Sequence, residues 1–138
     1  MSYALDVEIL SESCTVMDAI ATSEGISGWW TKTNAVSNEN GIELLFVDFG
    51  AVKKIIKVNS VEPLSQIKWE VLECTLSEWE GTTITLKVMP MGAGKSLLKL
   101  VHSGLTPDLE CFESCSFGWK YFMNSLKQYV ETGKGTPY

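Results

Sequence analysis

Apolar and polar residues alternate over much of the chain, which is the pattern of β-strands with one buried face. In residues 3–9 every second side chain is apolar, and Asp6 and Glu8 stand between them. Further alternating or mostly apolar runs cover residues 31–37, 42–49, 52–61, 66–73, 83–88 and 95–103. Short strands separated by turns of a few residues predict an antiparallel meander of about six to seven strands. In residues 42–49 the pattern leaves open which face points inward.

Two short segments after the first strand have the three-to-four-residue spacing of helices. The serine-rich start of residues 11–22 can cap the first of these helices. Residues 23–30 predict a second, shorter helix or helical turn, which we expect Gly25 and Gly28 to interrupt. These helices precede the long run of predicted strands, so they connect the first strand to the rest of the sheet.

A longer helix is predicted near the end of the sequence, where the period changes again. Its apolar stripe extends over about twenty residues, and Gly133 stands where a helix commonly stops. The stripe consists of Phe112, Cys115, Trp119, Phe122, Met123, Leu126 and Val130. Gly118 can let this helix approach either a strand or a ligand closely, and we favour close packing. Of the neighbouring pair Trp29 and Trp30, we expect one to pack inward and the other to sit near a rim.

The composition fits a single α+β domain spanning residues 1–138. The chain is 45% hydrophobic and contains 14 aromatic residues, which suffices for a core without disulfides or metals. The net charge of −6 argues against nucleic acid or an anionic membrane as the main partner, because both attract basic faces. No apolar run reaches the roughly 18 residues of a membrane span, and the first residues lack signal-peptide features. A cytoplasmic location without membrane insertion is the expectation.

The stretch MGAGKS, residues 91–96, resembles the end of a phosphate-binding loop. The first glycine of that motif would fall on Met89, and the loop must lead from a strand into a helix. Here both flanking segments alternate with period two. We therefore predict a hairpin connection, in which the glycines serve turn geometry.

The four cysteines and the single histidine are the candidates for reactive or metal-binding side chains. Cys111 and Cys115 are four residues apart, as in a redox pair or half of a metal site, but no further ligands accompany them. We expect small apolar side chains in a reducing compartment, with no metal and no cofactor. His102 lies on the inward face of its strand. It is a core residue bonded to a neighbour such as a tyrosine hydroxyl or a backbone carbonyl, an anchor for a ligand, or a general base.

Several segments carry a resemblance to a known superfamily. VMDAIATSEGISGWW is similar to the segment after the first strand in START-like domains, the SRPBCC superfamily with birch-pollen-allergen topology. WEGTTITLKV, the HSG after the last strand and GWKYFMNSLKQYVETGKGTPY resemble the AHSA group, named after the activator of the heat-shock-protein-90 ATPase. The resemblance implies a helix-grip fold, in which a curved antiparallel sheet holds the long last helix, with two short helices near the start.

The same resemblance implies a cavity between the sheet and the long helix that takes apolar or aromatic molecules. The candidate lining residues are Trp30, Trp69, Leu86, Leu98, Leu100, His102, Trp119, Phe122, Met123 and Leu126. The favoured function is binding of a small hydrophobic, aromatic or acyl molecule without catalysis. The alternatives are a protein-interaction domain that engages a chaperone, as the group's name suggests, and an enzyme acting on a cavity-bound substrate. A homodimer is also left open.

Overall fold

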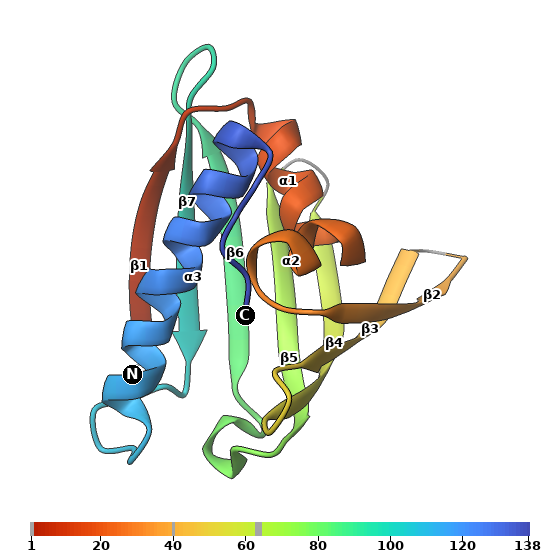
Figure 1. The fold of residues 1–138 in the computed structure, drawn as a ribbon, viewed down its shortest axis with the longest axis vertical. Coiled ribbons are helices and arrows are strands. Elements are labelled where there is room, and N and C mark those ends of the chain that lie inside the picture. Colours follow the sequence, from red (N-terminus) through yellow and green to blue (C-terminus); the bar gives the residue numbers. More distant parts are fainter. Residues whose placement is uncertain (1, 40, 63–64) are drawn as a thin grey trace.

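The computed structural model describes residues 2–39, 41–62 and 65–138, and it places the strands in one antiparallel sheet that holds a long helix (Figure 1). The strands, in chain order, are β1 (Ser2–Ile9), β2 (Thr33–Asn38), β3 (Gly41–Asp48), β4 (Lys53–Glu62), β5 (Gln66–Cys74), β6 (Thr83–Pro90) and β7 (Ser96–Ser103). The helices are α1 (Ser13–Ala21), α2 (Ser23–Trp29), the 3-10 turn η1 (Ser77–Trp79) and α3 (Phe112–Thr132). The predicted fold class is confirmed.

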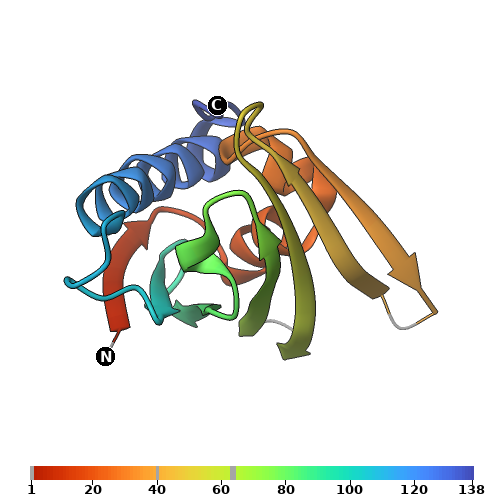
Figure 2. The ribbon, with the colours of Figure 1, turned by 90° about the horizontal axis from the view of Figure 1, so that it is seen from below.

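The sheet has seven strands in the order β1-β7-β6-β5-β4-β3-β2. Every strand from β2 to β7 therefore pairs with its neighbour in sequence, as in the predicted meander. The chain passes from β1 at one edge to β2 at the other through α1 and α2. These helices and α3 lie on the same face of the sheet, which curves around them (Figure 2). Within that face, α3 packs against β1, α1 and α2.

The MGAGKS stretch is a hairpin connection, as predicted. Residues on either side pair as antiparallel strands, with Val88 opposite Leu98 and Pro90 opposite Ser96. The Met91 amide donates to the Lys95 carbonyl across 2.9 Å and closes the turn. Gly92 and Gly94 adopt φ angles of 95° and 73°. Such positive angles favour glycine, which explains these residues without a bound phosphate.

The inward face of β3, left open by the sequence, carries Leu45 and Val47, while Phe46 points outward. Elsewhere the alternation predicted the buried face correctly. Ile67, Trp69 and Val71 of β5 are buried, and so are the inward residues of β6 and β7. Because burial of one apolar face fixes the register of each strand, a one-residue slip would expose this whole set.

Two expectations about the short helices were wrong. Trp29 and Trp30 do not diverge: both are buried, and their rings stack with centroids 5.7 Å apart. The backbone of Trp30 has already left the helix, with φ −102° and ψ −81°. The side chains of Trp29 and Trp30 therefore do not point apart as neighbours within a helix do. In addition, α1 has no side-chain cap from its serine-rich start, because Glu12 holds the capping position without such a bond.

Gly25 and Gly28 lie inside α2 rather than interrupting it. A β-carbon at Gly25 would come within 2.7 Å of the Ala19 backbone, and one at Gly28 within 2.3 Å of the Tyr129 ring. These glycines allow α2 to approach α1 and α3. The expectation for Gly118 was also wrong, because a β-carbon there would meet nothing within 4 Å.

We predict opposite effects of alanine at two helical glycines. Gly25→Ala should lower the free energy of unfolding by about 1–3 kcal/mol, because the added methyl collides with backbone that cannot rotate away. The matched change Gly118→Ala should raise it by up to about 1 kcal/mol, since alanine is the better helix former and the space is open. Urea unfolding followed by tryptophan fluorescence measures both values. Equal effects of the two changes would contradict the packing described for α2.

Candidate functional site

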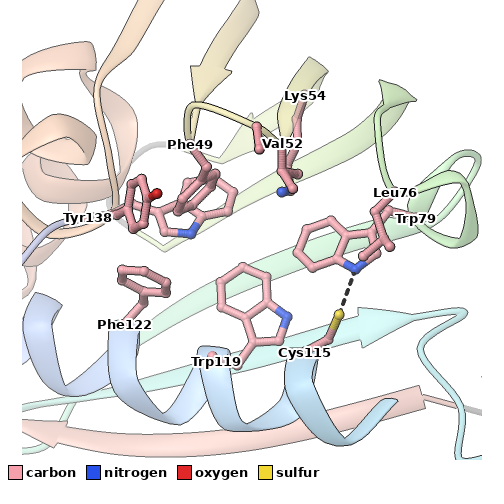
Figure 3. A pocket seen from close by; sticks show the side chains of 12 residues that line it. Phe49, Val52, Lys54, Leu76, Trp79, Cys115, Trp119, Phe122 and Tyr138 are labelled. Atoms are coloured by element: carbon pink, nitrogen blue, oxygen red, sulfur yellow. Dashed lines mark hydrogen bonds between the residues drawn. The ribbon is translucent and has the colours of Figure 1, made fainter. Parts of the chain in front are cut away.

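A cavity of about 340 Å³ opens between α3, the start of β4 and the turn η1 (Figure 3). Its wall is mostly aromatic and aliphatic. The lining residues are Trp30, Phe49, Ala51, Val52, Lys54, Leu76, Trp79, Cys115, Gly118, Trp119, Phe122 and Tyr138. Its volume lies at the small end of the roughly 300–1,000 Å³ that ligand sites occupy. The cavity therefore has room for one small organic molecule.

The deepest wall of the cavity belongs to an array that joins all five tryptophans of the sequence. Trp30 stacks on Trp29, Trp69 and Trp119, with ring centroids 5.7, 5.6 and 5.6 Å apart. Trp79 stacks in turn on Trp119 at 5.8 Å. All five side chains are buried. The array links α2, β5, η1 and α3, so the elements around the cavity are held by one block of rings.

The rim of the cavity is built from the β3–β4 connection and the last residue. The Phe49 ring lies 5.7 Å from Phe122 of α3 and 5.5 Å from Tyr138, and these three rings face one another in Figure 3. Tyr138 is fixed by its backbone amide, which donates to the Trp30 carbonyl across 2.9 Å, while its side chain stays 76% exposed. An exposed ring over a buried aromatic wall marks the side from which a molecule can enter.

Lys54 is the charged residue of the cavity wall. It comes from the inward face of β4 and is only 6% exposed. Its ammonium lies 4.5 Å from the centroid of the Trp79 ring and 4.6 Å from that of Phe49, so both rings supply cation–π contacts. Burial lowers the pKa of Lys54, while the sulfur atoms of Cys74 and Cys115 act in the opposite direction. No carboxylate within the described residues forms an ion pair with it.

His102 lies in the core, behind Trp119, and has a defined proton arrangement. The Trp119 indole N–H donates to Nδ1 across 3.0 Å, so that nitrogen carries no proton. Nε2 therefore holds the proton and donates to the Thr82 hydroxyl at 2.9 Å, which donates onward to the Trp79 carbonyl at 2.6 Å. Burial, with a smaller effect of the Lys54 charge, lowers the pKa of His102 to about 4. The partners are thus Trp119 and Thr82, not the tyrosine or carbonyl expected.

The ten residues predicted to line a cavity divide into two groups. Trp30, Trp119 and Phe122 border the cavity described above. The other seven are buried beside or beneath it and do not border it: Trp69, Leu86, Leu98, Leu100, His102, Met123 and Leu126. The sequence pattern identified the inward faces but not which inward residues meet packed neighbours and which meet open space.

Sequence reasoning missed Phe49, Lys54, Trp79 and Tyr138. A signal for Lys54 does exist, because it shares the inward face of β4 with Ile56, and an inward lysine in a half-buried strand is unusual. The remaining three lie in a loop, a short turn and the terminal segment, where no periodic pattern of apolar residues predicts contact with the cavity.

Cys115 of the cavity wall and Glu78 of η1 have hydrogen-bond partners within the protein. Cys115 accepts a hydrogen bond from the Trp79 indole at 3.1 Å, and no group of potential metal ligands gathers in the part of the chain that the structure describes. Glu78 is tied to the backbone rather than free in solvent. Its carboxylate accepts from the Cys111 and Glu110 amides, both at 3.0 Å, just before α3. Those bonds hold the pKa of Glu78 below its usual range.

No protein-family model matches the sequence, and no curated protein is similar to it at the level of sequence. Solved structures with the same fold do exist. The Aha1 dimer from Colwellia psychrerythraea, solved in solution, has a TM-score of 0.84 at 20% identity, covering 98% of this chain and 99% of that one. A START superfamily protein from Mycobacterium smegmatis has a TM-score of 0.79 at 13% identity, covering 96% and 99%.

A third similar structure is DynU16, a protein in the dynemicin biosynthetic locus. It has a TM-score of 0.79 at 21% identity over 99% of this chain, which matches only 49% of that longer one. These likenesses, together with the sheet that grips α3, define the START-like helix-grip fold. None of the helices in the described ranges combines the length and apolar character that crossing a membrane requires.

We predict that acid destabilises the protein through His102. The unfolded state binds a proton near pH 6.5 and the folded state only near pH 4, so stability is complete above pH 6.5 and falls as the pH drops through this window. The loss between pH 7 and pH 5 should be about 2 kcal/mol. His102→Gln, which cannot titrate, should flatten this part of the profile. Urea unfolding at a series of pH values measures the free energy of unfolding of the native protein and of the variant. Parallel pH profiles of the two proteins would refute the assignment of this loss to His102.

Proposed function

We propose that this protein binds a small hydrophobic molecule, an aromatic or medium-length acyl compound, in the cavity beside α3, without catalysing a reaction on it. The observation that carries the proposal is the cavity itself. Aromatic rings from α3, the end of α2, η1 and the β3–β4 connection converge on an open space of ligand size instead of filling it. A pocket that is mainly apolar and has few polar groups is the usual form of a small-molecule site.

Binding without chemistry is preferred because His102 does not face the cavity. Both of its ring nitrogens are engaged by protein partners, and the side chain is fully buried. A general base has to reach the proton that it removes, either directly or through one water. The enzyme alternative would therefore have to rest on residues other than the histidine that first suggested it.

The protein-interaction alternative is supported by the similar Aha1 structure, which is that of a dimer. Two exposed apolar side chains, Val36 and Phe46, lie on the neighbouring strands β2 and β3 at one edge of the sheet. An open sheet edge with apolar side chains is a place where a second chain can add. Homodimer formation through this edge is the form of this alternative that the structure supports best.

We predict that medium-chain fatty acids or small aromatic compounds raise the melting temperature and change tryptophan fluorescence. A ligand that binds only the folded state stabilises it by mass action, and Trp30, Trp79 and Trp119 border the cavity. Gly118→Leu should abolish both effects, because its side chain would grow into open space in the cavity. Gly118→Ala, which adds only one methyl group at the cavity wall, is the control and should leave both effects in place. The proposal would be contradicted if a broad lipid and metabolite screen changed neither the melting temperature nor the tryptophan fluorescence.

For the alternative, we predict a homodimer that Val36→Lys dissociates, because a charge on the edge strand β2 opposes strand addition. Sedimentation velocity and native mass spectrometry measure the assembly state, and Lys57→Met, an exposed change on β4, is the control. A monomer at all concentrations excludes the dimer. Failure of the purified protein to bind a chaperone or stimulate its ATPase excludes the chaperone role.

A further inference from the structure

We propose that the natural ligand is an organic carboxylate, whose anionic end lies against the ammonium of Lys54 and whose apolar part lies against the aromatic wall. This inference rests on the proposed function and adds the chemical class of the ligand. It begins from an imbalance in the site: a lysine is buried in an apolar cavity, and none of the described residues supplies a counter-charge to it.

The position of Lys54 has an energetic cost that the protein only partly offsets. Charged side chains are rarely buried unless they are paired, because removal of an ion from water is unfavourable. The faces of Phe49 and Trp79 supply attraction at 4.6 and 4.5 Å, but an aromatic ring accepts no strong hydrogen bond. An ammonium group has three donors. No oxygen acceptor for Nζ occurs in the described parts of the chain.

The groups that face Lys54 from other elements do not supply the missing negative charge. They are the Cys74 thiol of β5, the Cys115 thiol of α3 and the imidazole of His102 on β7. Burial raises the pKa of Cys74, which keeps that thiol neutral near pH 7. His102 would add a positive charge if it were protonated. A single negative charge from a ligand would therefore complete the site.

The geometry of the cavity narrows the class of anion. Figure 3 shows Lys54 reaching into the cavity from β4, across from Cys115 and Trp119 of α3. The rest of the wall toward Phe122 and Tyr138 is aromatic, so the ligand needs an apolar body on one side of its charged group. One ammonium balances one negative charge. A carboxylate matches this count, whereas a phosphate dianion would leave a buried charge unpaired.

The test compares matched pairs of charged and neutral probes: 3-phenylpropanoate with 3-phenylpropanamide, and octanoate with octanamide. Affinities are measured by isothermal titration calorimetry at pH 7 on the native protein, on Lys54→Met and on Lys57→Met. Lys57 is an exposed lysine of the same strand and serves as the matched control. Lys54→Met keeps the length and apolar character of the side chain, and it should fold stably because it removes an uncompensated buried charge.

We expect the native protein and Lys57→Met to prefer each carboxylate to its amide by roughly tenfold to a hundredfold, the value of a hydrogen bond to a charged group. In Lys54→Met the preference should fall to about twofold or less, with amide binding retained. Equal binding of acid and amide to the native protein, or a preference that survives Lys54→Met, overturns the carboxylate assignment but leaves the proposed function intact. Tighter binding of phenyl phosphate overturns it as well. Failure of every probe, charged and neutral, overturns both.

Discussion

The stacked array of five indole rings is the constraint on which the rest of this molecule depends. Trp30 lies at its centre, in contact with Trp29, Trp69 and Trp119. The bond from the Trp119 indole to His102 then fixes the rotation of α3 over the sheet. Centroid separations of 5.6 and 5.8 Å between nearly parallel rings are those of ordinary offset stacking, so the array is a packed block. The cavity lies beside this block, where Trp30, Trp79 and Trp119 border it.

The same array explains why the core and the candidate site are so closely joined. Trp30, Trp79 and Trp119 each have one side in the packed interior and border the cavity with another. His102 supports this wall from behind through two directed hydrogen bonds. Burial is the main cause of its low pKa, which keeps the ring neutral at pH 7 and lets Nδ1 accept from Trp119. Lys54, in contrast, faces the open space with its charge, on the side where the proposed ligand would bind.

The similar structures share this architecture at 13–21% sequence identity, so most individual side chains differ while the strand order and helix placement persist. What such distant chains can share is the alternation that fixes strand faces and the helical spacing that fixes the buried stripe. The wall of the cavity is free to vary on this frame. In this protein it presents an aromatic surface with one buried lysine, and the proposed ligand class rests on that wall and not on the fold.

The sequence by itself determined most of the elements and, except in β3, their buried faces, because burial of one face imposes a period of two on strands and of about 3.6 on helices. The inward residues of β5, β6 and β7, the stripe of α3 and the hairpin at MGAGKS all follow from this rule. Only the tertiary structure decided which inward residues border a void. Leu98 and Leu100 carry the same pattern as a cavity wall would, yet they pack into the core. Phe49 and Tyr138 reach the rim from segments without any period, because their positions depend on contacts between residues far apart in the chain.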